Sequence, residues 1–360
     1  MHFLLALAAA VSAASLLALP RAAQAEEAPR ISGPFTHQNL SVYFVHGKST
    51  TGPVPLTLQE ALDKGAVEVI ETGSVNELQI RNKGNTEIFI QSGDIVKGGR
   101  QDRVVTVSFL LPAKSGKVPL ASFCVEQGRW SPRGTENSSQ FSSAAESMPS
   151  REAKLAMKAP LAAAPAPLEV SKSNARRQSA SAGDETGERQ RKVWDEVAKT
   201  QTKLSGGVKE KVNSAVSESS LQLALENEKL KASREDYIKA LENQGSGGDD
   251  IIGYVFAVNG RINSADLYPS NALFRKMWSK LLAASVTEAI GETTAASPAA
   301  AAPPEAAAVT EFLASAETGK QSSQEIAGLA QQEVRDADKS LFVGVRSKKG
   351  EWVHRNYLVK

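Results

Sequence analysis

Residues 254–267, with the sequence YVFAVNGRINSADL, decide the fold of the C-terminal half of this chain. Two runs rich in apolar residues flank Asn259-Gly260, a dipeptide that suits two-residue hairpin turns because both central positions need positive φ. The stretch therefore predicts an antiparallel β-hairpin. A second hairpin is predicted further on, where residues 341–345 and 351–358 flank a polar turn at 346–350.

Helices are expected between and beside these hairpins. Residues 271–290 and 306–316 have helical composition, and an Ala/Pro segment at 295–304 separates them. Two hairpins with intervening helices predict a four-stranded antiparallel sheet with helices on one face.

The N-terminal half is rich in β-strand signals. A capping box at Thr57 and Glu60, with Gly65 as a stop, predicts one short helix there. Short apolar runs bounded by turn residues predict an antiparallel β sandwich or small barrel. The expected strands are residues 40–45, 67–70, 77–82, 87–90, 104–111 and 118–125.

Composition changes again in the middle of the chain. Residues 133–188 are dominated by Ser, Ala and Pro, which predicts a low-complexity linker, although residues 152–157 have the pattern of a short strand or helix. Residues 189–204 and 208–244 then predict amphipathic helices. The expected class is α+β: a β-rich domain at 33–132, a helical middle, and an α+β domain at 189–360 that ends in the two-hairpin sheet.

The N-terminus predicts export. An apolar run from Phe3 to Leu19 is followed by small residues with Ala-x-Ala spacing, which is typical of a signal peptide at 1–25 cleaved after Ala25. An uncleaved anchor is the alternative, although the run is short for a membrane span. No later stretch has the length and apolarity of a span. We therefore expect a periplasmic or extracellular protein.

Charge and cysteine usage narrow the function further. Removing residues 1–25 takes away Arg21 and no acidic residue, so the net charge falls from +2 to +1. A nearly neutral chain has no global attraction to nucleic acid, and we expect no nucleic-acid partner. The single cysteine, Cys124, forbids an internal disulfide and lies in an apolar run that predicts a buried, inert thiol.

Metal and cofactor chemistry are not indicated. The histidines that remain after export, His37, His46 and His354, lack ligand spacing and are expected at the surface. The sequence carries no phosphate-binding glycine loop with its lysine, because Gly99 stands where that lysine belongs. We expect no metal site and no cofactor.

Two polar runs that interrupt the strand pattern are the candidate site. They are residues 93–103, GDIVKGGRQDR, and residues 124–130, CVEQGRW. If strands 87–90, 104–111 and 118–125 are neighbours, both runs fall at one end of the sheet. The candidate residues are Asp94, Lys97, Arg100, Gln101, Asp102, Arg103, Glu126, Gln127, Arg129 and Trp130.

Two interpretations of this edge remain open. In the structural one, ion pairs such as Arg103 with Glu126, or Asp94 with Arg129, fasten two loops. In the functional one, the basic side chains bind an anion or carboxylate, Gly98-Gly99 lets backbone approach the ligand, and Trp130 forms a wall.

With these runs identified, the chain resembles the ARG and Rhodanese-Phosphatase-superfamily-associated Protein domain family. The resemblance is most specific at residues 124–130 and extends through 39–43, 56–62, 73–78, 101–104 and 256–261 to the end of the chain. Two departures stand out. Asp94 is followed by Ile95 where the family has a second acidic residue, and residues 99–103 are GRQDR where the family has a small residue followed by Lys-Gln-Asn-Arg.

The resemblance implies no particular reaction, so three functions are compared. The first is an exported, non-enzymatic module that binds a small anionic or polar ligand, or a protein partner, through the two runs. The second is a hydrolase that draws its acid and base from Asp94, Asp102 and Glu126. The third is a structural envelope protein.

Overall fold

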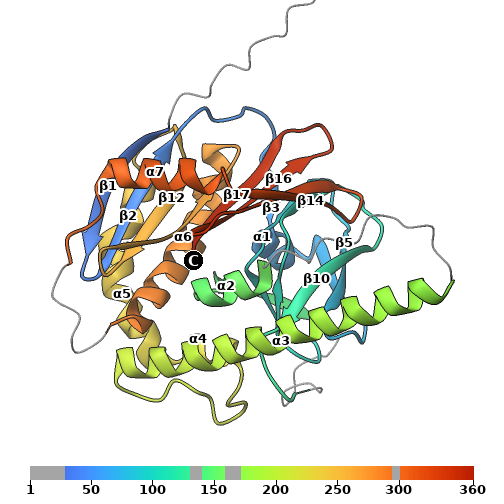
Figure 1. Ribbon diagram of the computed structural model, residues 1–360. Helices are drawn as coiled ribbons and strands as arrows, with labels where there is room; N and C mark the ends of the chain where they lie inside the picture. The colour runs from blue at the N-terminus through green and yellow to red at the C-terminus, as the bar shows by residue number, and fades with distance from the viewer. Residues whose placement is uncertain (1–28, 130–139, 159–171, 294–300) are drawn as a thin grey trace, which may run out of the picture.

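The computed structural model describes residues 29–129, 140–158, 172–293 and 301–360, with the side chains of 172–184 left out. Its largest element is an eight-stranded antiparallel sheet with the order β1-β2-β12-β13-β17-β16-β15-β14 (Figure 1). The two predicted hairpins supply the four central strands: β12 (Ile251–Val258), β13 (Arg261–Leu267), β16 (Ser340–Ser347) and β17 (Trp352–Val359). Asn259 and Gly260 adopt φ of 51° and 72°, as the predicted turn requires.

Four further strands extend this sheet on both sides. β1 (Arg30–His37) and β2 (Leu40–His46) add to β12, so the first two strands of the chain lie in the C-terminal sheet. β14 (Lys320–Ile326) and β15 (Ala330–Asp336) add to β16. β14 has the sequence KQSSQEI, which lacks the alternation of apolar and polar residues from which a strand is predicted, and almost all of it is exposed.

Helices cover both faces of this sheet, so the prediction of helices on one face is wrong. Side chains alternate across a strand: Phe44 and Tyr254 belong to the core cluster that includes α6 (Asn271–Gly291), whereas Tyr43 and Val255 pack in a separate cluster with α7 (Ala306–Ala316). The central strands are buried on both faces and need both helices.

The N-terminal half is a half-barrel, made of a six-stranded sheet, β11-β7-β8-β10-β5-β4, and a three-stranded sheet, β3-β6-β9. The capping box of α1 (Leu58–Asp63) forms as predicted. The expected strand 104–111 is divided in two, because its outer parts pair in different sheets. The strands are β3 (Leu56–Thr57), β4 (Val67–Glu71), β5 (Glu77–Asn82), β6 (Ile88–Ile90), β7 (Asp94–Gly98), β8 (Arg103–Val105), β9 (Phe109–Leu111), β10 (Val118–Cys124) and β11 (Phe141–Ser147).

Two elements lie within residues 133–188, where composition predicts a linker. β11 pairs with β7, and α2 (Arg151–Lys158) packs its Ala153 and Met157 into the core. The helix α2 is one of the two alternatives predicted at 152–157, whereas β11, whose side chains are mostly small, becomes a strand through pairing with β7 and is not specified by its composition. Residues 133–139 and 159–171 of the expected linker lie outside the described residues.

Four helical elements form the middle of the chain. The long α3 (Lys172–Val208) begins well before the predicted 189, and it lies along the half-barrel and α6 (Figure 1). The second predicted helix is divided into α4 (Leu221–Leu225), α5 (Glu228–Leu241) and the 3-10 helix η1 (Glu242–Ser246).

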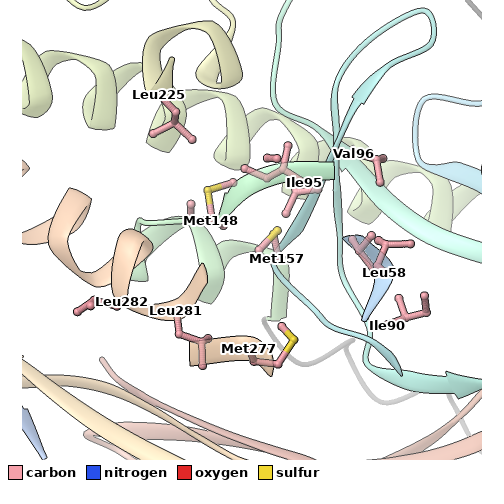
Figure 2. Close-up of a cluster of buried hydrophobic side chains, with 14 of the residues drawn as sticks. Leu58, Ile90, Ile95, Val96, Met148, Met157, Leu225, Met277, Leu281 and Leu282 are labelled. Atoms are coloured by element: carbon pink, nitrogen blue, oxygen red, sulfur yellow. The ribbon is translucent and has the colours of Figure 1, made fainter. Parts of the chain in front are cut away.

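One hydrophobic core joins the half-barrel to the large sheet. Figure 2 shows its centre, where Met148 and Met157 lie between Ile95 of β7 and Leu281 of α6. Residues 148–158 therefore connect the two β-rich parts. No helix within the described ranges has the length and apolarity needed to cross a membrane.

Candidate functional site

The two polar runs meet at one end of the half-barrel. β8 and β10 are antiparallel, with Arg103 opposite Cys124, so the run before β8 and the run after β10 leave the sheet together. Gln101 Nε2 donates to the carbonyl oxygen of Glu126 at 3.1 Å. We call the cluster formed by residues 100–103 and 124–129 the motif corner.

Buried ion pairs hold the motif corner together. Arg129 Nε donates to Glu126 Oε2 at 2.6 Å, and its Nη2 lies 3.7 Å from Asp102 Oδ1. Both carboxylates are completely buried. Asp102 also accepts hydrogen bonds from the Gly98 N–H at 2.9 Å and from Ser220 Oγ, the N-cap of α4, at 3.3 Å. One carboxylate therefore ties β7, the corner and α4 together.

Arg103 is the largest fully buried side chain of the corner. Its Nη1 donates to the Gln101 carbonyl at 2.9 Å, and its Nη2 lies 3.8 Å from Glu71 Oε1 of β4, whereas the sequence predicts Glu126 as its partner. Glu71 Oε2 also accepts from the Arg100 N–H at 3.1 Å. The guanidinium therefore connects the corner to β4.

Two predicted site residues lie on β7 and make contacts away from the corner. Asp94 Oδ1 lies 2.7 Å from Lys280 Nζ of α6, rather than pairing with Arg129 as the sequence predicts. Lys97 Nζ donates to Glu226 at 2.8 Å, at the end of α4. The unexpected strand character of residues 94–98 directs these side chains toward the helices.

Gln127, Trp130 and Gly98 are the other predicted features of the site. Gln127 is exposed, and its carbonyl accepts from Ser219 Oγ at 2.7 Å. Trp130 lies outside the described residues. Gly98 has a φ of 121°, and a Cβ there would come within 2.4 Å of the Gln140 carbonyl oxygen, so the glycine lets β7 approach the start of β11.

Cys124 is the inert thiol that the sequence predicts. It is fully buried, its Sγ donates to Gln101 Oε1 at 2.8 Å, and burial raises its pKa to about 12. A thiol with so high a pKa is not a nucleophile at neutral pH. Among the described residues, the charged side chains of the motif corner contact one another and join loops to strands.

A second polar cluster, which the sequence analysis missed, surrounds a small cavity between α2, α6 and the large sheet. We call it the interior cavity, and its space is that of about one water molecule. Tyr254, Asp266 and Asn356 lie opposite one another on β12, β13 and β17 and form its floor. Its lining comprises Gln91, Ser92, Ser147, Lys154, Lys158, Tyr254, Asp266, Leu281, Ala284 and Asn356.

Two lysines of α2 line this cavity. Lys154 and Lys158 are one helical turn apart and therefore on the same face. Lys154 is only 8% exposed, and burial lowers the pKa of Lys158 to about 8. Lys158 Nζ donates to Asn356 Oδ1 at 2.5 Å. Neither ammonium is within ion-pair distance of a carboxylate in the described part of the chain.

The carboxylate of the cavity, Asp266, is already hydrogen-bonded. Its Oδ1 accepts from Asn356 Nδ2 at 2.8 Å and contacts His354 Nε2 at 3.1 Å. Ser108 Oγ accepts from the Ser92 N–H, so its own proton is available to His354 Nδ1 at 3.1 Å. We therefore assign a neutral imidazole that carries its proton on Nε2 and donates to Asp266.

Burial and hydrogen bonding shift the pKa values of Asp266 and His354. Burial alone would raise the pKa of Asp266, but the hydrogen bond from neutral His354 and the nearby charges of Lys154 and Lys158 hold it below its usual range. Burial lowers the pKa of His354.

His354 is 2% exposed, so the prediction of a surface histidine is wrong. Ser108, His354 and Asp266 form a Ser-His-Asp row, but the Ser108 hydroxyl is 2% exposed and does not line the cavity.

The interior cavity therefore has more positive charge than negative and a spare hydroxyl. Two ammonium groups face one engaged carboxylate, and the buried Ser147 Oγ has no hydrogen-bond partner among the described residues. A buried charge without a counter-charge is costly. Such an arrangement can bind a small anion.

Sequence signals for this cavity exist. The stretch of α2, residues 151–158, has the pattern REAKLAMK, with two lysines at i, i+4 beside apolar residues that the core buries. Asp266, His354 and Asn356 are polar residues of hairpin strands in which they are buried. Polar residues on the buried face of a strand indicate a functional or structural polar cluster.

These features define an α+β protein with a half-barrel fused to a two-sided antiparallel sheet. A family model matches residues 28–358, and the chain belongs to that family, ARPP-1, the ARG and Rhodanese-Phosphatase-superfamily-associated Protein domain. No curated protein and no solved structure matches the chain.

Proposed function

We propose that this protein is an exported, non-enzymatic module that binds a small anion in the interior cavity. The observation that carries the proposal is the pair of ammonium groups of buried Lys154 and half-buried Lys158, neither of which has a carboxylate within ion-pair distance among the described residues. Export rests on the signal-like sequence of residues 1–25, which lie outside the described part.

Electrostatics favours an anion as the ligand. Like charges one turn apart on a helix repel each other, and burial in a low-dielectric interior strengthens that repulsion. An anion between Lys154 and Lys158 would attract both, and the Ser147 hydroxyl could donate to it. The apolar walls, Leu281 and Ala284, and a space of about one water molecule favour the smallest oxyanions, such as formate, which would enter with a shift of the lysine side chains, over a larger ligand.

The motif corner supports a structural role better than a catalytic one. Asp94, Asp102 and Glu126, the carboxylates of the hydrolase alternative, each contact a buried or half-buried cation. A general base needs an accessible lone pair and room for substrate. We infer that the corner fastens the end of the half-barrel.

A ligand screen on the purified chain from residue 26 onward tests the proposal. Formate and acetate are titrated calorimetrically in a buffer of large anions, with phosphate as the larger anion expected to bind least and melting temperature as a second readout. We expect at least one small oxyanion to bind and to raise the melting temperature.

Two variants localise the binding. Lys158→Met should abolish it, because one of the two ammonium groups is removed. Lys211→Met removes the same charge from an exposed ion pair and should leave affinity unchanged. Absence of binding to every probe, or equal binding by both variants, would contradict the proposed function.

A further inference from the structure

A second hollow lies between α2, α3 and α6. We call it the Glu288 hollow. It is more open than the interior cavity, and Leu204 and Gly291 give it apolar walls. Carboxylates from all three elements or their ends line it: Glu152, Glu196, Glu288 and Glu292. A cluster of acidic side chains alone does not make a binding site. Whether this hollow can bind a cation depends on which of its carboxylates already contact a cation or a hydrogen-bond donor.

Three of the four carboxylates have their own cation. Glu196 contacts Lys199 at 2.7 Å, and Glu152 contacts Arg151 at 2.6 Å. Glu292 contacts Lys203 at 2.5 Å. These ion pairs are half-buried or exposed, and the net charge of each pair is zero. They leave Glu288 as the carboxylate of the hollow that has no cation within ion-pair distance among the described residues.

Glu288 is buried with one oxygen unused. The residue is 8% exposed, and its Oε1 accepts from the Arg151 N–H at 3.1 Å and from Asn263 Nδ2 at 2.8 Å. Its Oε2 is buried and has no hydrogen-bond partner in the described part of the chain. Lys154 attracts Glu288 through space but is not within ion-pair distance. A buried carboxylate oxygen without a donor is costly, which indicates that a donor from outside completes it.

We propose that the Glu288 hollow binds the primary ammonium group of an aliphatic amine, with Glu288 Oε2 as its acceptor and Leu204 and Gly291 contacting its methylene groups. This site is separate from the interior cavity and has the opposite charge preference.

The donor set favours an ammonium over other cations. A guanidinium binds a carboxylate best through both oxygens, but Oε1 of Glu288 already accepts two hydrogen bonds. Mg²⁺ and Ca²⁺ require several oxygen ligands at once, and the other three carboxylates of the hollow are held by Lys199, Arg151 and Lys203. A single free oxygen suits a point charge with directional N–H donors.

The proposal is tested by comparing two ligands of similar size and different charge. n-Butylamine and 1-butanol are titrated into the purified chain from residue 26 onward at pH 7.5, with affinity measured by calorimetry or by NMR shifts of residues on α6. We expect the amine to bind at least about tenfold more tightly than the alcohol, a difference of about 1.4 kcal/mol. Equal affinities, or displacement of the amine by millimolar Mg²⁺ or Ca²⁺, would overturn the proposal.

Two variants assign the binding to Glu288. Glu288→Gln keeps an acceptor for the Arg151 N–H and Asn263 but replaces the free oxygen by an NH₂ donor, so we expect amine affinity to fall by at least about tenfold. Glu196→Gln is the matched control, since that carboxylate already pairs with Lys199, and it should change affinity much less. The proposal is wrong if both variants bind the amine equally well.

A pH series on the unmodified chain gives a readout that needs no variant. Burial raises the pKa of Glu288 to about 6, so acidification from pH 7.5 to pH 5 should protonate the carboxylate and weaken amine binding. The charged groups that face Glu288 are Arg151, Glu152 and Lys154 from α2, Glu196, Lys199 and Lys203 from α3, and Glu292 after α6. An affinity that is constant across this range would contradict the role of Glu288.

Discussion

Asn356 Oδ1 accepts from Lys158 Nζ at 2.5 Å, and the amide nitrogen of the same side chain donates to Asp266 at 2.8 Å. The amide thus lies between the half-buried Lys158 ammonium and the Asp266 carboxylate. A direct ion pair would neutralise Lys158, whereas an intervening amide leaves its charge available to a ligand. This relationship distinguishes the interior cavity from the motif corner, where carboxylates and guanidinium groups contact each other directly.

Lys158→Met should stabilise the protein while removing anion binding. The pKa of Lys158 falls from 10.5 to about 8 on folding, which is a destabilisation of about 3 kcal/mol at neutral pH. Loss of the hydrogen bond to Asn356 offsets about 1 kcal/mol, so we expect a net gain of about 2 kcal/mol in urea unfolding. Lys280→Met is the matched control: it leaves the buried Asp94 without its cation and should lose about 3 kcal/mol. A loss of stability in Lys158→Met would instead indicate a structural lysine.

The same lysine predicts a rise of stability at alkaline pH. Its pKa is about 8 in the folded chain and 10.5 in the unfolded chain, so between these values the unfolded chain binds more protons. Stability contributed by this group therefore increases as pH rises through the window. Urea unfolding at pH 7.5, 9 and 10 measures the difference between the unmodified chain and Lys158→Met. The advantage of the variant should shrink as pH rises; an unchanged difference would contradict the shifted pKa.

Arg129→Ala should destabilise the fold without changing anion affinity. The substitution leaves the fully buried Asp102 and Glu126 without the guanidinium that contacts both, which we expect to cost about 3–5 kcal/mol in urea unfolding. Arg81→Ala is the control, since Arg81 forms a half-exposed pair with Glu68, and it should cost less than about 1 kcal/mol. If folded Arg129→Ala binds the anion more weakly, the result would contradict this prediction and indicate that the motif corner is the binding site.

His354 predicts a loss of stability on mild acidification. Burial holds the pKa of folded His354 below 6.5, its value in the unfolded chain, so below pH 6.5 the unfolded chain takes up a proton that the folded chain refuses. Glu288 acts in the opposite direction between pH 4.5 and about 6, because its folded pKa is raised. Comparing urea unfolding of the unmodified chain with that of His354→Gln at pH 7 and 6 isolates the histidine. The variant should depend less on pH in this interval; parallel curves would contradict a buried neutral imidazole.

Local signals predicted the elements whose own residues specify them. Asn259-Gly260 fixes one hairpin turn through its positive φ angles, and the Thr57–Glu60 box fixes the start of α1. β14 has no such signal, because its exposed polar residues would equally suit a loop. β7 was missed because charge and glycine in residues 94–98 indicate a loop, and only pairing with β8 and β11 makes the segment a strand.

The candidate site was predicted in part for the same reason. β8 and β10 pair as antiparallel neighbours, as the sequence predicts for the strands near 104 and 118–125, and this pairing brings the runs around Gln101 and Glu126 together. The partner of Asp94 is Lys280, which comes from a helix far along the chain, and no local pattern predicts that contact. The interior cavity draws on α2, α6 and three strands of the large sheet, so it exists only once the tertiary fold is formed.

The most direct test of the central claim is the pKa of the Lys158 ammonium, measured by NMR on the chain from residue 26 onward in a buffer of large anions and then with the best-binding small oxyanion. An anion held beside Lys158 favours the charged form, so the account predicts a pKa near 8 that rises clearly when the anion is added. A value that stays the same with saturating oxyanion would contradict the claim that this cavity binds one.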